Sequence, residues 1–303
     1  MKEKQKKNYF RRHWQLYAMF LPAAILLLIF NYGPMYGAVL AFKDFTPRAG
    51  ILGSEWIGLE NFKTLFSNSY FFTVLKNTLK ISFLKFLVGF PVPIILALLM
   101  NEVGSSKFKR TIQTVSYLPY FISWVVVSGI LIDICSIEGG IINELIQFFG
   151  GEAINFFGNG KAFVALLIVS DIWKGAGWGT IIYFAALSGI DPAIYEASMI
   201  DGANRWQRIR YIIVPFLVPA ISINLLLTCQ NFMYAGFDQI FNLYNRTLYE
   251  SADIIDTYIY RIGITDGKYE MSTALGLFNS VITITLILLT NKSIKKMGGR
   301  ALW

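Results

Sequence analysis

The stretch DPAIYEASMIDGANRWQRIRYIIVPFLVP, residues 191–219, decides the fold, because it sets a polar, helix-prone island between two long apolar runs. Each flanking run is long enough to cross a bilayer. Asp191 stands where a side chain caps a helix, and Pro192 stands at the first helical position, where its missing N–H costs nothing. The island is therefore predicted to be a helix and not a slack connection.

The apolar residues of this island follow a helical period. Ala193, Ala197 and Ile200 recur on one face, and Gly202 then interrupts the pattern. A second short helix is expected from Ala203, leading straight into the next apolar run. The stretch thus predicts two short amphipathic helices joined by a bend at a membrane surface, here called the knuckle (191–208). The simplest role for such a structure is an interfacial helix on lipid headgroups.

The composition places the chain in a membrane. Of its 303 residues 55% are hydrophobic and only 15% are charged, and the mean hydropathy is +0.51. A soluble fold of this size is rarely so apolar. The net charge of +8 comes from basic residues that cluster at the ends of apolar runs, which indicates membrane topology and not nucleic-acid binding.

The chain lacks the residue patterns that disulfide frameworks, metal sites, histidine-based catalysis and phosphate binding require. The two cysteines, Cys135 and Cys229, lie far apart without CxxC spacing, so neither a disulfide framework nor a metal site is implied. His13 is the only histidine, which leaves no Cys/His or Ser/His pair for catalysis. No GxxxxGK[ST] phosphate loop occurs. We expect no enzyme activity and no cofactor in this chain, so any ATP would act through a partner.

The hydropathy pattern predicts an all-α polytopic membrane protein. We divide the chain into a basic N-terminus at 1–15, a first span at 16–40, an outer loop at 41–73, a five-helix core at 74–291 with the knuckle at 191–208, and a tail at 292–303. The six expected spans are 16–40, 74–100, 112–132, 162–187, 209–234 and 271–291.

The basic residues predict the orientation of these spans. Sixteen Lys and Arg residues fall on the side that holds both termini and the knuckle, and six fall on the opposite side. Because cytoplasmic loops carry an excess of basic residues, both termini and the knuckle are expected in the cytoplasm.

The knuckle also resembles a known motif. Glu196, Ala197, Ser198, Asp201, Gly202 and Ala203, followed by Ile212 and Pro215, are similar to the EAA…DGA…I..P loop of binding-protein-dependent ABC importer permeases. Ser198 stands where the family usually has a second alanine. The resemblance extends over nearly the whole chain and points to the carbohydrate-type subgroup for oligosaccharides and polysaccharide fragments, through NYGPMYG (31–37), GSEWIGLENF (53–62), PVPIILALLMNEV (91–103), KRTIQTVSYLPYFISWVVV (109–127), AALSGIDP (185–192) and DTYIYRIG (256–263).

This resemblance implies a type I ABC importer permease in a bacterial cytoplasmic membrane. Its knuckle would be the coupling helix that docks on a cytoplasmic ATPase, with Arg205 completing the docking surface. The implied partners are a second homologous permease, two ATPase subunits that use ATP and Mg, an extracellular binding protein and a saccharide. Nucleic acid is not expected as a partner.

Polar residues inside the spans are candidates for the substrate pathway, because unsatisfied polar groups are costly in a membrane. Interhelical hydrogen bonds and close helix packing would explain the same residues without a ligand. In particular, Asp171 and Lys174 are spaced to face each other on one helix as a mutually satisfied pair. The candidates are Asp171, Trp173, Lys174, Trp178, Asn224, Gln230, Asn231, Tyr234 and Asp238.

Two other functions remain open at this point. An ion-coupled secondary transporter would use Asp171 and Lys174 as a relay and would need no ATPase. An importer of the same architecture for amino acids, ions or peptides would satisfy every argument from the residues, and only the subgroup resemblance favours a saccharide.

Overall fold

The computed structural model describes residues 12–296, so the basic residues before Arg12 and the tail after Lys296 lie outside the described part. The chain divides into two compact units. The first comprises residues 1–67 with 262–277, and the second comprises residues 68–261 with 278–303.

The first unit begins with one long helical run and continues into a small loop structure. Asn61 anchors the loop, because its side-chain amide donates to the carbonyls of Ala41 and Lys43 at 3.0 Å each. In chain order the elements are α2 (Trp14–Leu27), η1 (Leu28–Tyr32), α3 (Gly33–Met35), η2 (Tyr36–Phe42), β1 (Lys43–Asp44), α4 (Gly50–Gly53), β2 (Glu55–Trp56) and α5 (Glu60–Ser67), with β1 and β2 antiparallel.

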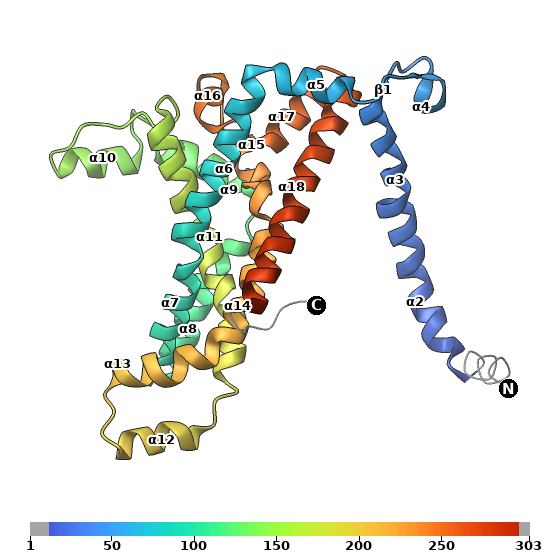
Figure 1. Cartoon of the computed structure of the whole chain (residues 1–303). Helices are drawn as coiled ribbons and strands as arrows, with labels where there is room; N and C mark the ends of the chain where they lie inside the picture. The colour runs from blue at the N-terminus through green and yellow to red at the C-terminus, as the bar shows by residue number, and fades with distance from the viewer. Residues whose placement is uncertain (1–11, 297–303) are drawn as a thin grey trace. The chain divides into compact units, whose positions relative to one another are not determined.

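The second unit is almost entirely helical in its described residues (Figure 1). Its elements are α6 (Ser69–Gly89), α7 (Pro91–Asn101), α8 (Ser106–Tyr117), η3 (Leu118–Phe121), α9 (Trp124–Ile134), α10 (Ile141–Phe148), α11 (Gly160–Leu187), α12 (Pro192–Ile200), α13 (Arg205–Arg208), η4 (Ile209–Ile213), α14 (Val214–Gln230), η5 (Phe232–Tyr234), α15 (Phe237–Leu243), η6 (Arg246–Leu248), α16 (Tyr249–Ala252) and α17 (Ile255–Tyr260). Two further elements, η7 (Arg261–Thr265) and α18 (Tyr269–Lys296), belong partly to each unit.

Five helices among the described residues are long and apolar enough to cross a membrane. They are Trp14–Phe42, Ser69–Asn101, Gly160–Leu187, Arg205–Gln230 and Tyr269–Lys296. The prediction of one span at 112–132 is wrong as a continuous helix, because Ser106–Phe121 and Trp124–Ile134 meet at 99°. Pro119 lies in η3, and the extended Ser123 then caps α9 by accepting a hydrogen bond from the Val126 amide. The count reaches six only if this bent pair is one span.

The helix after the knuckle also ends earlier than predicted. We expected it to run to Tyr234, but α14 ends at Gln230 and the chain breaks at two left-handed residues. Ala235 has φ +51° and Gly236 has φ +93°, and α15 starts directly after them. Two successive left-handed residues cannot continue a right-handed helix, so the break separates α14 from α15.

Three glycines of α11, Gly175, Gly177 and Gly179, are spaced two residues apart, and small residues of this kind permit close helix packing. A Cβ atom at Gly177 would overlap the Ser116 carbonyl, and one at Gly179 would come within 2.9 Å of the Pro93 ring. Gly175 differs, since nothing lies within 4 Å of its Cβ position. Close packing therefore explains two of the three glycines.

Candidate functional site

The knuckle is a helix that starts as the sequence predicts. The Asp191 carboxylate accepts a hydrogen bond of 2.9 Å from the Ala193 amide, and Pro192 occupies the first helical position of α12. Figure 1 shows α12 and α13 at one end of the second unit and α15 to α17 at the other. The second helix of the knuckle begins at Arg205, two residues later than the predicted Ala203, because Asn204 caps it.

The end of α12 depends on Gly202. This residue has φ +77°, and its amide donates to the Met199 carbonyl at 3.1 Å. The Ala203 amide donates to the Ser198 carbonyl at 2.9 Å, which completes a Schellman motif. Asn204 and Gln207 then form a reciprocal capping box at the start of α13. These caps at both helices hold the bend between them in one conformation.

The knuckle presents an uncovered mixed surface within the described residues. Ile200 is 87% exposed and Trp206 is 69% exposed, so each helix of the knuckle presents one large apolar side chain. Of the predicted docking residues Ser198 is buried and Ala203 is partly buried, whereas Glu196, Ala197, Asp201, Gly202 and Arg205 are exposed. Behind the bend lies a hollow of about 280 Å³, lined by Asp201, Gly202, Ala203, Gln207, Arg208, Tyr211 and Ile212.

A cavity of about 350 Å³ lies deeper in the second unit, between α6, α11, α14 and the break that follows α14. Four predicted pathway residues line it, namely Asp171, Asn224, Asn231 and Tyr234. Asn224 is oriented by the Tyr183 hydroxyl, which accepts a 2.7 Å hydrogen bond from the Asn224 amide. The other lining residues are Ser82, Lys85, Phe86, Gly89, Phe90, Pro93, Trp124, Ile172, Gly175, Ala176, Thr228, Phe232, Ala235 and Gly236.

The charged pair of the cavity wall differs from the predicted one. Asp171 forms its ion pair with Lys85 of α6, at 3.3 Å, and not with Lys174. Lys174 instead donates to the carbonyls of Pro119, Tyr120 and Ile122 at 3.3, 2.7 and 2.6 Å. The helix is interrupted there by η3 and the bend, which leaves backbone carbonyls accessible to the Lys174 ammonium, although the Pro119 carbonyl also accepts from the Ile122 amide at 3.2 Å. The hypothesis of a mutually satisfied Asp171 and Lys174 pair is therefore wrong.

Lys85 was missed by the sequence interpretation, although a lysine within a candidate span is itself a signal. Its ammonium also donates to Gln239 of α15, and a Cβ at Gly236 would lie against the same ammonium. The Gln239 amide donates in turn to the Leu167 carbonyl and the Ser170 hydroxyl, each at 2.8 Å. This chain of hydrogen bonds ties α6, α11 and α15 together beside the cavity.

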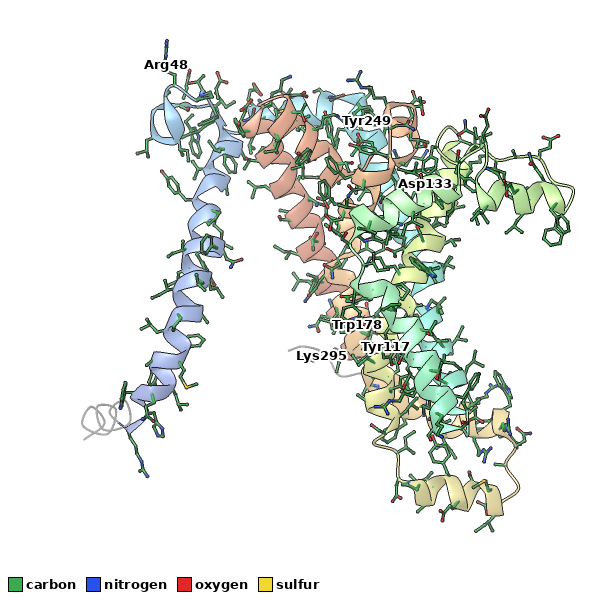
Figure 2. All side chains as sticks on the ribbon, turned by 180° about the vertical axis from the view of Figure 1, so that it is seen from behind. Arg48, Tyr117, Asp133, Trp178, Tyr249 and Lys295 are labelled. Carbon is green, nitrogen blue, oxygen red and sulfur yellow. The ribbon has the colours of Figure 1, made fainter. Side chains whose placement is uncertain are left out.

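The remaining pathway candidates lie outside the cavity lining. Trp178 stacks on Tyr120 with ring centroids 4.5 Å apart, and Figure 2 shows it on the same stretch of the unit as Tyr117, whose hydroxyl accepts from Thr180. Trp173 lines a separate, apolar hollow with α9 and α10 residues. Asp238 accepts a 3.0 Å hydrogen bond from the Tyr234 hydroxyl, and Gln230 is exposed.

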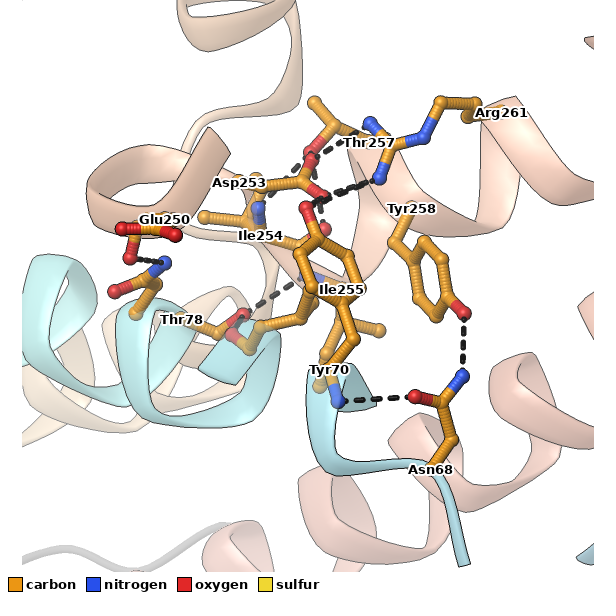
Figure 3. A network of polar contacts seen from close by, with 12 residues as sticks. Asn68, Tyr70, Thr78, Glu250, Asp253, Ile254, Ile255, Thr257, Tyr258 and Arg261 are labelled. Atoms are coloured by element: carbon orange, nitrogen blue, oxygen red, sulfur yellow. Dashed lines mark hydrogen bonds and ion pairs between the residues drawn. The ribbon is translucent and has the colours of Figure 1, made fainter. Parts of the chain in front are cut away.

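A polar network holds the segment after α15 onto the start of α6 (Figure 3). Asp253 is fully buried and forms an ion pair with Arg261. The Tyr70 and Thr257 hydroxyls donate to the same carboxylate at 2.6 and 2.7 Å. Burial alone would lower the pKa of Arg261, but the hydrogen bond and the charge of Asp253 outweigh it and raise that pKa. Sequence spacing cannot reveal that Tyr70 joins this network, because it is 183 residues away from Asp253 in the chain.

Comparisons with known proteins agree with this architecture. The chain is 44% identical to the polygalacturonan/rhamnogalacturonan transport system permease protein YteP of Bacillus subtilis (strain 168), over 100% of this chain and 95% of that protein. It is 42% identical to protein LplB of the same strain, over 97% of this chain and 92% of the relative. The crystal structure of a bacterial ABC transporter involved in the import of the acidic polysaccharide alginate contains a chain that matches with a TM-score of 0.89 and 41% identity, covering 96% of this chain and 99% of that one.

The match to a family profile covers the part of the chain that carries the knuckle and most of the cavity. Residues 89–293 match the profile described as binding-protein-dependent transport system inner membrane component. Because that segment is more than half of the chain and the relatives above span nearly all of it, this multi-pass membrane protein belongs to the family of binding-protein-dependent transport system inner membrane components.

Proposed function

We propose that this chain is the transmembrane subunit of an ATP-driven importer that passes a saccharide from an external binding protein to the cytoplasm. Its companions would be a second homologous permease and two ATPase subunits, which would bind the ATP and Mg. The knuckle would dock on an ATPase subunit through Glu196, Ala197, Asp201, Gly202 and Arg205. The prevalence of basic residues on the knuckle side supports a cytoplasmic position for it and for both termini.

The observation that carries this proposal is the position of α12 between two helices that reach the cavity. The chain runs from α11, which contributes Asp171 to the cavity, through a short loop into α12. It continues from α13 through η4 into α14, whose far end contributes Asn224 and Thr228. A displacement of α12 therefore acts on two of the cavity walls at once.

A buried apolar cluster couples these helices at the base of the unit. Tyr183 and Leu187 of α11 pack with Leu217 of α14 and with Ala97 of α7, and the partly buried Tyr195 of α12 packs against them. Such close-packed contacts transmit displacement because protein interiors are barely compressible. Closure of two ATPase subunits on ATP would draw the knuckles together and tilt the helices, which is alternating access between two states of the cavity.

The cavity suits a saccharide. Amide side chains at Asn224 and Asn231 pair with hydroxyl groups, and rings at Phe86, Phe232 and Tyr234 offer apolar faces to sugar C–H groups. Relatives whose names specify polygalacturonan, rhamnogalacturonan and alginate support the same class. A non-sugar solute is the alternative cargo for the same machinery.

The experiment is purification of the complex followed by uptake in proteoliposomes. Ile200→Asp should remove the ATPase chains from the purified complex and abolish ATP-driven uptake of labelled oligosaccharide, because it places a charge in the exposed knuckle. Phe148→Asp is the matched control, since Phe148 is 82% exposed on α10 at the other end of the unit. Transport by the chain without any ATPase would contradict the proposal and favour an ion-coupled transporter. Import of only a non-sugar solute would contradict the assignment of a saccharide as the cargo.

A further inference from the structure

Two lysines on α6 have no partner within the described residues. Lys76 and Lys80 are exposed, and neither makes a hydrogen bond or an ion pair in residues 12–296. Lys85, further along the same helix, is neutralised by Asp171. All three belong to one candidate span, Ser69–Asn101. Unpaired cations are costly in a membrane-crossing helix, so Lys76 and Lys80 must face water or an anion.

These two lysines stand on a groove that meets the cavity. The groove has a volume of about 570 Å³, and its surface is formed by aromatic rings, aliphatic side chains and the apolar stems of the two exposed lysines. Phe232 lines both the groove and the cavity, so the two spaces share a wall. The groove is lined by Phe72, Leu75, Lys76, Leu79, Lys80, Phe83 and Phe232.

The groove lies toward the start of α6, away from the knuckle. Lys76 and Lys80 lie in the first half of the candidate span Ser69–Asn101, and Figure 1 places α12 at the opposite end of this unit from the start of α6. Ser69–Asn101 has 33 residues, more than the roughly 20 that a bilayer requires. If α12 faces the cytoplasm, the groove is the approach to the cavity from outside.

We propose that Lys76 and Lys80 bind the carboxylates of an anionic saccharide as it passes from outside into the cavity. This inference rests on the proposed function and specifies its cargo as a uronate-type chain. Two lysines and no acidic residue border the groove, whereas the inner cavity pairs its one lysine with Asp171. Anionic sugars are therefore selected at the groove. Lys76 and Lys80, one helical turn apart, present adjacent ammonium groups, and Phe72, Phe83 and Phe232 offer ring faces to the sugar.

The test measures binding of two labelled probes, a trimer of galacturonic acid and a trimer of galactose, to the purified complex. The double variant Lys76→Gln with Lys80→Gln should weaken binding of the acidic trimer by roughly tenfold and leave the neutral trimer unchanged. The double variant with arginine at both positions should retain acidic binding, because the charge is kept. Lys161→Gln, an exposed lysine at the start of α11, is the control and should change neither.

Other occupants give different results. Equal weakening of both trimers, or no change in either, overturns the inference. If the lysines hold lipid phosphate, the glutamine variant will lose a dependence on phosphatidylglycerol in nanodiscs without discriminating the trimers. If the two lysines pair with carboxylates of the second permease, the purified complex of the glutamine variant will lack that subunit. If proteoliposomes with the glutamine variant import the acidic trimer as well as the wild type does, this inference alone is overturned. If the wild type imports neither trimer, the proposed saccharide function is overturned as well.

Discussion

Lys85 of α6 and Asp171 of α11 form an ion pair of 3.3 Å in the wall of the cavity, and the two partners are unequally buried. The Lys85 side chain is 10% exposed, and that of Asp171 is 41% exposed. Asp171 can therefore be hydrated from the cavity, whereas Lys85 depends on Asp171 and Gln239. The pair fixes the spacing of two helices that line the proposed pathway.

This asymmetry predicts unequal effects of the two single substitutions. Asp171→Asn should destabilise the complex more than Lys85→Met, because it leaves a buried ammonium without its counter-charge. The double variant should recover part of the loss, with a coupling energy of about 1 to 3 kcal/mol in a double-mutant cycle. Thermal unfolding in detergent provides the measurement. Strictly additive effects, or a larger loss for Lys85→Met, would contradict the proposed asymmetry.

A substitution at Gly202 should leave the fold of this chain intact but should prevent the knuckle from docking on the ATPase. Its Cβ position is free of contacts within 4 Å in this chain, and its φ of +77° is accessible to Asp and Asn at modest cost. Gly202→Asp should thus insert and fold, yet lose ATPase co-purification and ATP-driven uptake, since the open space is where the partner would sit. Gly58→Asp is a matched control, because Gly58 has φ +65° and equally free space in the first unit. Normal uptake by Gly202→Asp would count against docking at this bend.

The knuckle was predictable because its determinants are local. Asp191, Pro192 and Gly202 act on amides and dihedral angles within a few residues, so the sequence contains the complete instruction for α12. The same holds for the long apolar runs, whose length and hydropathy alone indicate spans.

The charged contacts were not predictable from spacing. An i, i+3 relation brings Asp171 near Lys174 on the helix surface, but it cannot reveal that α6 brings Lys85 and that the broken helix before α9 offers carbonyls to Lys174. The bend between η3 and α9 was hidden because the residues of η3 and of α9 are both largely apolar. The mean hydropathy therefore stays high across the bend and does not mark it. The three lysines of the span that starts at Ser69 could have been singled out as ionisable residues in a membrane helix.

The buried pair of Asp253 and Arg261 should be a main support of the second unit. Arg261→Met would leave a fully buried carboxylate with only the Tyr70 and Thr257 hydroxyls and would cost about 3 to 5 kcal/mol of unfolding free energy. The matched control is Arg246→Met, an exposed arginine of η6 with no ion pair among the described residues, which should have little effect. Both are read from thermal unfolding in detergent. Equal stability of the two variants would show that Asp253 is not held as described.

Asp256 gives the second unit a stability that falls as the pH rises. Burial raises the pKa of Asp256 to about 6, whereas a carboxyl in an unfolded chain titrates near about 3.9. The folded protein therefore keeps the proton over this window, and the unfolded chain releases it. The resulting stability is fully present below about pH 4 and is lost as the pH rises through about 6, by on the order of 3 kcal/mol. Asp256→Asn lacks this titration and should instead keep a neutral group beside the Asn279 amide. Thermal unfolding of the wild type and of Asp256→Asn between about pH 4 and about pH 6 isolates this effect, because every other group titrates equally in the two proteins. A stability difference between the two proteins that stays constant with pH would contradict the prediction. A difference that changes in favour of the wild type at high pH would contradict it as well.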